Sequence, residues 1–247
     1  MIICFNTAAS GMYIGYFDLW KYCVEKSYPG TLSHCTVLEK TTTTYEAAVL
    51  RLLEDSCQIA DYVYTTDVDI MHLPCENIIE YHKNRMAATG LCYSNTPRKK
   101  EYLGSKRLTG LHFASREWYH KTKNIREMYL HMLAQGEIGN GRFDDELVLM
   151  KVCKESGLGI PPTEPLINRH GGIHLGTFRN YHSHSKNKQN QQLRMRINYQ
   201  QAECWLKFYD DPEFKKIVAD TAKKSRVIKE ELVALYSFCM RTINGAH

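Results

Sequence analysis

Two aspartates separated by one residue, Asp67 and Asp69, follow an apolar stretch of the chain that is typical of a β-strand, residues 62–66. Side chains alternate across a strand, so residues two apart project to the same side. Two carboxylates that project together suit a hard divalent cation, which prefers oxygen ligands and can share them with phosphate groups. Alone, the pair also fits a solvated turn, so the surrounding sequence must decide between the two interpretations.

The elements that must position this pair alternate between strand and helix patterns over the first 100 residues. Strands are expected at 2–6, 34–38, 62–66 and 87–93, and helices at 10–26, 45–55 and 77–84. This alternation predicts an α/β fold with a mixed, mostly parallel sheet and helices on both faces. Ligands of such sheets collect beyond the carboxyl ends of the strands, which is where Asp67 and Asp69 lie.

The rest of the chain is less regular and ends in helices. A β-type segment is expected at 108–114, a helix from about 116, a second helix at 143–156, and C-terminal helices that end with 227–243. Asp144, Asp145 and Glu146 open the 143–156 helix. Acidic residues in a first turn favour the helix dipole, which gives them an ordinary structural role as well as a chemical one.

Composition and cysteine usage favour a soluble globular protein of the cytoplasm. Hydrophobic residues make up 43% and charged residues 24% of the chain. The nine cysteines are scattered and form no Cys-x-x-Cys pair, which argues against a zinc ribbon or a disulfide framework and for a reducing compartment. No apolar run approaches the roughly 20 residues that a membrane span needs.

The formal charge of +5 lies at the C-terminal end of the chain. Residues 183–247 hold 12 Lys/Arg and 7 Asp/Glu of the 32 and 27 in the whole chain, so the preceding 182 residues are neutral. We expect this basic part to bind peripherally to a membrane surface, to form a homodimer contact, or to be a solvated helical face. It lacks a regular alternation of aromatic and basic residues, so no nucleic-acid partner is expected.

Several segments, in their order along the chain, resemble the GT-A glycosyltransferases, most closely the family of glycogenin and the bacterial lipooligosaccharide galactosyltransferases. These segments are the helix with Arg51, the triplet Asp67-Val68-Asp69, residues 109–113, the start of the 143–156 helix, and residues 174–179. The resemblance covers about residues 1–180. It implies a GT-A (Rossmann-like) catalytic domain over residues 1–182 and a basic helical extension over 183–247.

The resemblance implies a metal-dependent transfer of a hexosyl or pentosyl group from a nucleotide sugar, expected to be UDP-linked, to a glycan acceptor. Asp67, Asp69 and His174 match the family's ligands for Mn²⁺ or Mg²⁺. A dication and an arginine stabilise the charge that develops on a departing diphosphate. An imidazole beside two carboxylates tolerates Mn²⁺ better than Mg²⁺.

The resemblance also places residues around the donor and the reacting atoms. Those implied at the donor are Asn6, Thr7 and Ala8 after the first strand, Tyr13 on the base, Arg51, His112 and Arg179. His112 can equally be a packed strand-end histidine. Asp144 and Asp145 are the expected catalytic pair, and Asp145 stands where the family usually has an amide. Because a carboxylate can accept a proton or attack as a nucleophile, both inversion and retention stay open.

Two other functions compete with this interpretation. A magnesium-dependent nucleotidyltransferase acting on a sugar phosphate also uses paired acids on an α/β sheet. It normally needs a glycine-rich, basic loop after the first strand, whereas residues 7–11 contain one glycine and no basic residue. The other alternative is a non-enzymatic basic protein that binds its partner through residues 183–247.

Overall fold

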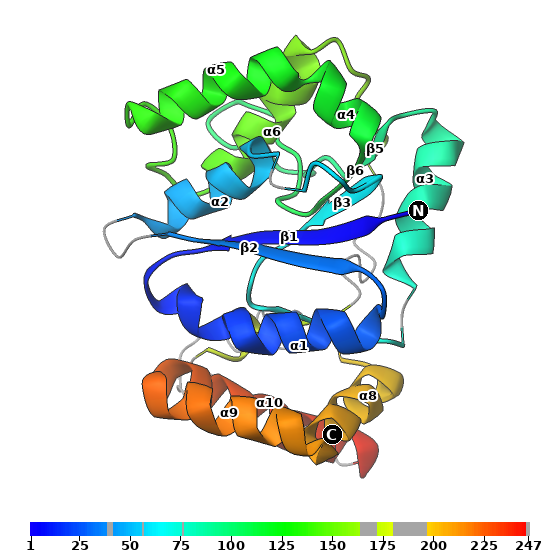
Figure 1. Ribbon diagram of the computed structural model, residues 1–247, viewed down its shortest axis with the longest axis vertical. Helices are drawn as coiled ribbons and strands as arrows, with labels where there is room; N and C mark the ends of the chain where they lie inside the picture. Colours follow the sequence, from blue (N-terminus) through cyan, green and yellow to red (C-terminus); the bar gives the residue numbers. More distant parts are fainter. Residues whose placement is uncertain (39–41, 56, 76, 164–171, 180–196, 246–247) are drawn as a thin grey trace. The chain divides into compact units, whose positions relative to one another are not determined.

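The computed structural model describes residues 1–38, 42–55, 57–75, 77–163, 172–179 and 197–245 (Figure 1). The chain forms two compact units. The first, here called the sheet unit, comprises residues 1–14, 30–67 and 78–169; the second, the helical unit, comprises residues 15–29, 68–77 and 170–247. The domain boundary expected at residues 182/183 lies outside the described residues and stays a prediction.

The sheet unit is built on five strands in the order β2-β1-β3-β6-β5. Strand β1 (Ile3–Ala9) pairs in parallel with β2 (Leu32–Val37) and with β3 (Tyr62–Thr65). Strand β6 (His112–Ser115) pairs antiparallel with β3 and with β5 (Tyr93–Ser94). Only β6 therefore runs against the other four strands, and the predicted mixed, mostly parallel sheet is confirmed.

Helices cover both faces of this sheet. Neighbouring residues of a strand point to opposite faces, so each face packs against different helices. Val63 of β3 joins a buried cluster contributed by four helices, whereas the ring of Tyr64 packs 5.0 Å from the ring of His82 in α3. The four helices on the Val63 side are α2 (Thr44–Leu53), α4 (Arg116–Lys121), α5 (Lys123–Ala134) and α6 (Asp144–Glu155) (Figure 1). Helix α3 spans Ile78–Thr89.

The helical unit combines a small sheet with long helices. Strand β4 (Ile70–His72) pairs antiparallel with β7 (Gly172–His174), and the turn η2 (Leu175–Phe178) follows β7 directly. The helices are α1 (Phe17–Ser27), which follows η1 (Gly11–Tyr16), and then α8 (Tyr199–Asp210), α9 (Pro212–Lys224) and α10 (Arg226–Ile243). Tyr22 of α1 packs its ring 5.0 Å from Phe214 of α9, so the C-terminal helices share a core with α1. The predicted helical C-terminal extension is confirmed.

One local prediction is wrong. The strand expected at 87–93 is mostly helix, because Ala87 and Ala88 favour α3 and Gly90, with φ of +66°, ends that helix before β5 begins at Tyr93. The cysteines form no disulfide framework in the described residues, but one buried pair is joined. Cys4 of β1 is bonded to Cys57 with Cα atoms 6.4 Å apart, and this is the disulfide found within the described residues.

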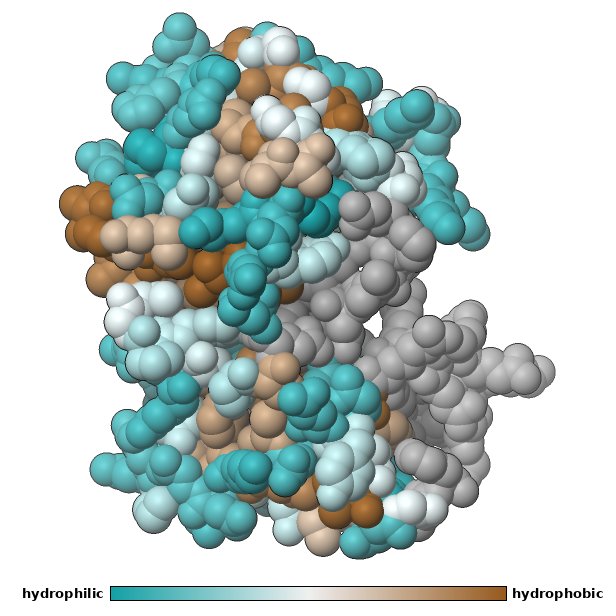
Figure 2. All heavy atoms as spheres, turned by 90° about the vertical axis from the view of Figure 1, so that its right-hand side faces the viewer, coloured by the Kyte–Doolittle hydropathy of each residue, from teal (hydrophilic) through white to brown (hydrophobic). Residues whose placement is uncertain are grey.

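Within the described ranges, no helix is both long enough and apolar enough to cross a bilayer. Figure 2 shows hydrophilic residues over most of the described surface of one face, with smaller hydrophobic areas between them.

Candidate active site

The end of strand β3 leads directly into the Asp67-Val68-Asp69 turn. The backbone N–H of Thr66 donates to the carbonyl of Asn6 in β1 (2.9 Å), and the hydroxyl of Thr7 donates to the carbonyl of Thr66 (2.9 Å). The neighbouring strand therefore fixes the residue that precedes the first aspartate. These hydrogen bonds fix the carboxyl end of the short, buried strand, and the two aspartates follow it directly.

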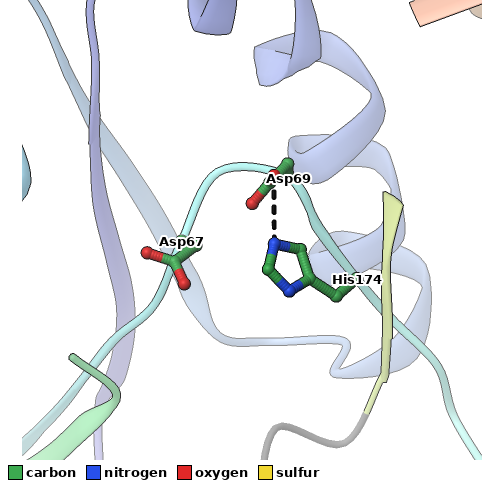
Figure 3. Close-up of side chains that lie close together, drawn as sticks. All are labelled: Asp67, Asp69 and His174. Carbon is green, nitrogen blue, oxygen red and sulfur yellow. Dashed lines mark hydrogen bonds and ion pairs between the residues drawn. The ribbon is translucent and has the colours of Figure 1, made fainter. Parts of the chain in front are cut away.

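Asp69 is held against His174 by the pairing of β4 with β7. Ile70 lies opposite His174 in the ladder, and the N–H of Leu175 donates to the carbonyl of Asp69 (2.8 Å). The carboxylate of Asp69 lies 3.1 Å from the imidazole Nε2 of His174, toward which the ring faces (Figure 3). The Asp69 side chain is only 6% exposed, whereas the histidine is partly open to solvent. A cation that binds here must replace the proton shared by these two groups.

Asp67, Asp69 and His174 together form a cluster that could hold a metal ion, with one ligand atom from each residue within 4.8 Å of the others (Figure 3). Two carboxylates and one imidazole fit Mn²⁺ or a related dication. An octahedral ion with bonds of about 2.1 Å holds its ligand atoms roughly 3 to 4 Å apart. The Asp69–His174 separation of 3.1 Å falls in this range.

Gly176 lies so close to this cluster that a side chain at its position would collide with the ligand atoms. A Cβ atom at this position would lie 2.7 Å from Oδ2 of Asp69, 3.3 Å from Nε2 of His174 and 3.7 Å from Nη2 of Arg179. No larger residue fits here without moving the carboxylate. The glycine thus brings the backbone of η2 close to the ligand atoms.

Arg51 links Asp67 to a second carboxylate within the sheet unit. The helix that carries it, α2, begins with a capping box made by Thr43 and Glu46. The Arg51 guanidinium, 4% exposed, donates to the carbonyl of Thr66 (2.7 Å), forms an ion pair with Asp67 and lies 3.3 Å from Oδ2 of Asp145. The arginine therefore neutralises two acids that would otherwise repel each other in a partly buried place.

Asp145 and Asp144 have different surroundings although they are neighbours in α6. Burial raises the pKa of Asp145, and the nearby charge of Asp67 adds to this, while Arg51 acts in the opposite direction. Gly110 lies beside it, because a Cβ there would be 2.7 Å from Asp145 Oδ2. Asp144 instead accepts backbone N–H groups of the loop before α6, at residues 139, 140 and 141, at 3.1, 3.0 and 2.9 Å. These three hydrogen bonds hold the loop before α6 in place, so the contacts of Asp144 are structural.

Arg179, which is partly exposed, is hydrogen-bonded to two buried residues in a network that the sequence did not reveal. Its Nε donates to Glu231 of α10 (2.7 Å), its Nη2 donates to the hydroxyl of Tyr16 (3.2 Å), and that hydroxyl donates to Glu231 (2.5 Å). Burial raises the pKa of Glu231, while its hydrogen bonds from Tyr16 and Arg179 lower it. One signal could have found this acid: it lies on the apolar face of the 227–243 pattern, where a solvated glutamate does not belong.

The remaining predicted residues are mostly buried. Asn6 donates from its amide to the carbonyl of Arg51 (2.9 Å) and accepts from His34 (3.0 Å). Thr7 and Ala8 are buried in β1, and Tyr13 is partly buried in η1. His112 packs between the rings of Tyr93 and Trp118, with ring centroids at 5.3 and 4.5 Å, and burial lowers its pKa to about 3. A neutral, enclosed imidazole of this kind presents no surface to a donor in this conformation.

Comparisons with known proteins give distant similarities in fold. No family model and no curated protein matches the chain. Among solved structures, an active-site mutant of LgtC is 14% identical with a TM-score of 0.35 over 62% of this chain and 69% of LgtC. The galactosyltransferase LgtC in complex with donor and acceptor sugar analogs is 13% identical, with a TM-score of 0.31 over 62% and 70%. At these values function does not transfer, so the site itself must support any assignment.

Proposed function

We propose that the protein is a metal-dependent glycosyltransferase that moves a sugar from a nucleotide-sugar donor, a UDP-sugar first of all, to a glycan acceptor. The observation that carries this proposal is the cluster of Asp67, Asp69 and His174 after strand β3. Its ligand chemistry suits a dication that also binds phosphate oxygens. The carboxyl end of an α/β strand is also where such folds bind nucleotides.

In this proposal Asp67, Asp69 and His174 hold Mn²⁺. The ion would bind the donor diphosphate and stabilise the charge that it acquires as it leaves. Arg179 supplies a second positive charge near Asp69, since both groups lie within 4 Å of the same point, the Cβ position of Gly176. Glu231 and Tyr16 keep the arginine in this place.

Asp145 is the proposed reacting carboxylate. In the inverting route it takes the proton of an acceptor hydroxyl while that oxygen bonds to the anomeric carbon and the bond to the diphosphate breaks. In the retaining route the carboxylate itself bonds to the anomeric carbon while the bond to the diphosphate breaks. The acceptor oxygen then displaces the carboxylate and gives its proton to the departed diphosphate. A raised pKa makes the group a better base than an ordinary aspartate, which favours the first route.

The test is donor turnover with and without metal. Purified protein is incubated with Mn²⁺ or with EDTA against UDP-, GDP- and CMP-linked sugars, and released nucleotide is measured. We expect Mn²⁺-dependent release of nucleoside diphosphate that Asp69→Asn abolishes and that Asp220→Asn, an exposed acid on α9, leaves unchanged. Pyrophosphate release from a nucleoside triphosphate and a sugar phosphate would instead indicate a nucleotidyltransferase. Equal turnover in EDTA would refute the proposed metal.

A further inference from the structure

Residues 97–108 form a β-hairpin in the sheet unit, here called the basic hairpin. Bridges join Pro97 to Leu108 and Tyr102 to Ser105. The N–H of Tyr102 donates to the carbonyl of Ser105 (3.0 Å), and the N–H of Ser105 donates to the carbonyl of Tyr102 (2.9 Å). The hairpin therefore closes with a two-residue turn made of Leu103 and Gly104.

The tip of the basic hairpin contains an unusual residue. Leu103 has φ of +49° and Gly104 has φ of +72°, so both central residues are left-handed, as in a type I′ turn. Asn-Gly and Gly-Gly favour this turn, whereas a leucine is strained in it. The side chain of Leu103 is nevertheless 85% exposed. Neither burial nor turn chemistry accounts for a leucine at this position.

The base of the basic hairpin is fixed to helix α6. Arg98 donates from Nε to Glu146 (2.9 Å), and Arg107 forms an ion pair with the other oxygen of the same carboxylate. The Arg107 guanidinium also lies 4.0 Å above the ring of Phe143, against which Tyr102 packs at 5.2 Å. These contacts hold the two arginines at the base and Tyr102 next to the turn, so the tip is presented on a fixed support.

The exposed part of the hairpin carries a net positive charge around the leucine. Lys99, Lys100 and Lys106 are exposed, with Glu101 as the only acid between residues 97 and 108. The combination is an aliphatic side chain at the tip with lysines on both strands. Such a group matches a bilayer with anionic headgroups, where the leucine enters the interface and the ammonium groups meet lipid phosphates.

We propose that the basic hairpin docks the protein on an anionic lipid surface through Leu103 and the three lysines. A nucleic acid is disfavoured because the aromatic residue of the hairpin, Tyr102, is packed on Phe143 and cannot stack on bases. The inference does not depend on the proposed glycosyl transfer, because it concerns binding alone.

The test is flotation with vesicles of phosphatidylcholine alone and of phosphatidylcholine with 30% phosphatidylserine, at low and high salt. We expect binding to the anionic vesicles that weakens with salt. Leu103→Asn should bind about tenfold more weakly, because the buried aliphatic side chain is lost. The same variant should melt at an equal or higher temperature than the wild type, because asparagine suits the left-handed turn. A merely structural leucine would not combine weaker binding with higher stability.

Two further variants complete the test. Glutamine at Lys99, Lys100 and Lys106 should weaken binding about fivefold per lysine. The control is Ile59→Asn, which removes another exposed aliphatic side chain (72%) from the same unit and should bind like the wild type. The proposal is overturned if Leu103→Asn and the triple lysine variant float as well as the wild type, which would place binding elsewhere in the chain. It is equally overturned if the wild type binds heparin or DNA but neither kind of vesicle.

Discussion

Replacing Gly176 with alanine tests how the turn after β7 shapes the metal cluster. The new Cβ would lie 2.7 Å from Asp69 Oδ2 and 3.3 Å from His174 Nε2. Because ordinary contacts begin near 3.4 Å, the carboxylate must move by roughly half an ångström or more. Metal ligands need positions held to about that precision, so the substitution should disturb the site without unfolding it.

The expected loss follows from what perturbed ligand surroundings do in metal sites. Changes next to the ligands usually cost about 10- to 100-fold in metal affinity, or about 1.4 to 2.8 kcal/mol. Gly176 is outside the left-handed region, so alanine brings no backbone strain. The free energy of unfolding should therefore change by no more than about 1 kcal/mol.

Titration of Mn²⁺ followed by electron paramagnetic resonance measures the affinity directly, because free and bound ions give different signals. The matched control is Gly159→Ala, whose Cβ would meet only the side chain of Leu91, at 3.1 Å. The control should keep the wild-type affinity. An unchanged affinity in Gly176→Ala, with the fold intact, would show that the ion does not bind beside Asp69.

Three other substitutions have defined outcomes. Arg51→Met should lower the free energy of unfolding in urea by about 2 to 4 kcal/mol, because Asp67 and Asp145 lose a shared buried cation; a loss below 0.5 kcal/mol would contradict this. Asp145→Asn should slow transfer about 10²- to 10⁴-fold. The folded-state pKa of Asp145 is raised, so its stabilising contribution is present below about pH 4 and is lost as the pH rises through the folded pKa. The asparagine variant should accordingly gain stability relative to the wild type between pH 4 and pH 7, and a relative loss over that range would refute the assigned shift. Gly172→Ala would place a Cβ on the carbonyl of Met71, so it should cost about 3 kcal/mol or more and abolish Mn²⁺ binding, whereas wild-type values for both would refute the β4–β7 pairing.

Local signals in the sequence predict much of the sheet unit. The threonine run before the second helix predicts its N-cap, and Thr43 makes a full capping box there. The apolar stretch before Asp67 predicts β3, although the strand ends at Thr65, one residue earlier than expected. Each of these features depends on residues close together in the chain, which is why periodicity and capping rules find them.

Features that depend on contacts between residues far apart in the sequence cannot be predicted from such local patterns. Strands β4 and β7 are three residues each, too short to produce a period, and they exist because Gly172 lets two backbones approach closely. Glu231 follows Arg179 by 52 residues, and only its position on an apolar helix face indicates burial. The disulfide between Cys4 and Cys57 likewise depends on the packing of β1, not on cysteine spacing.

The central claim is that Asp67, Asp69 and His174 bind one dication that a nucleotide diphosphate shares. A crystal structure with Mn²⁺ and UDP, with the ion located by its anomalous scattering, tests this most directly. We predict a single strong peak within about 2.3 Å of an oxygen of each aspartate and of the histidine Nε2, with diphosphate oxygens completing the shell. A peak elsewhere, with Asp67 still on Arg51 and Asp69 still on His174, would contradict the claim.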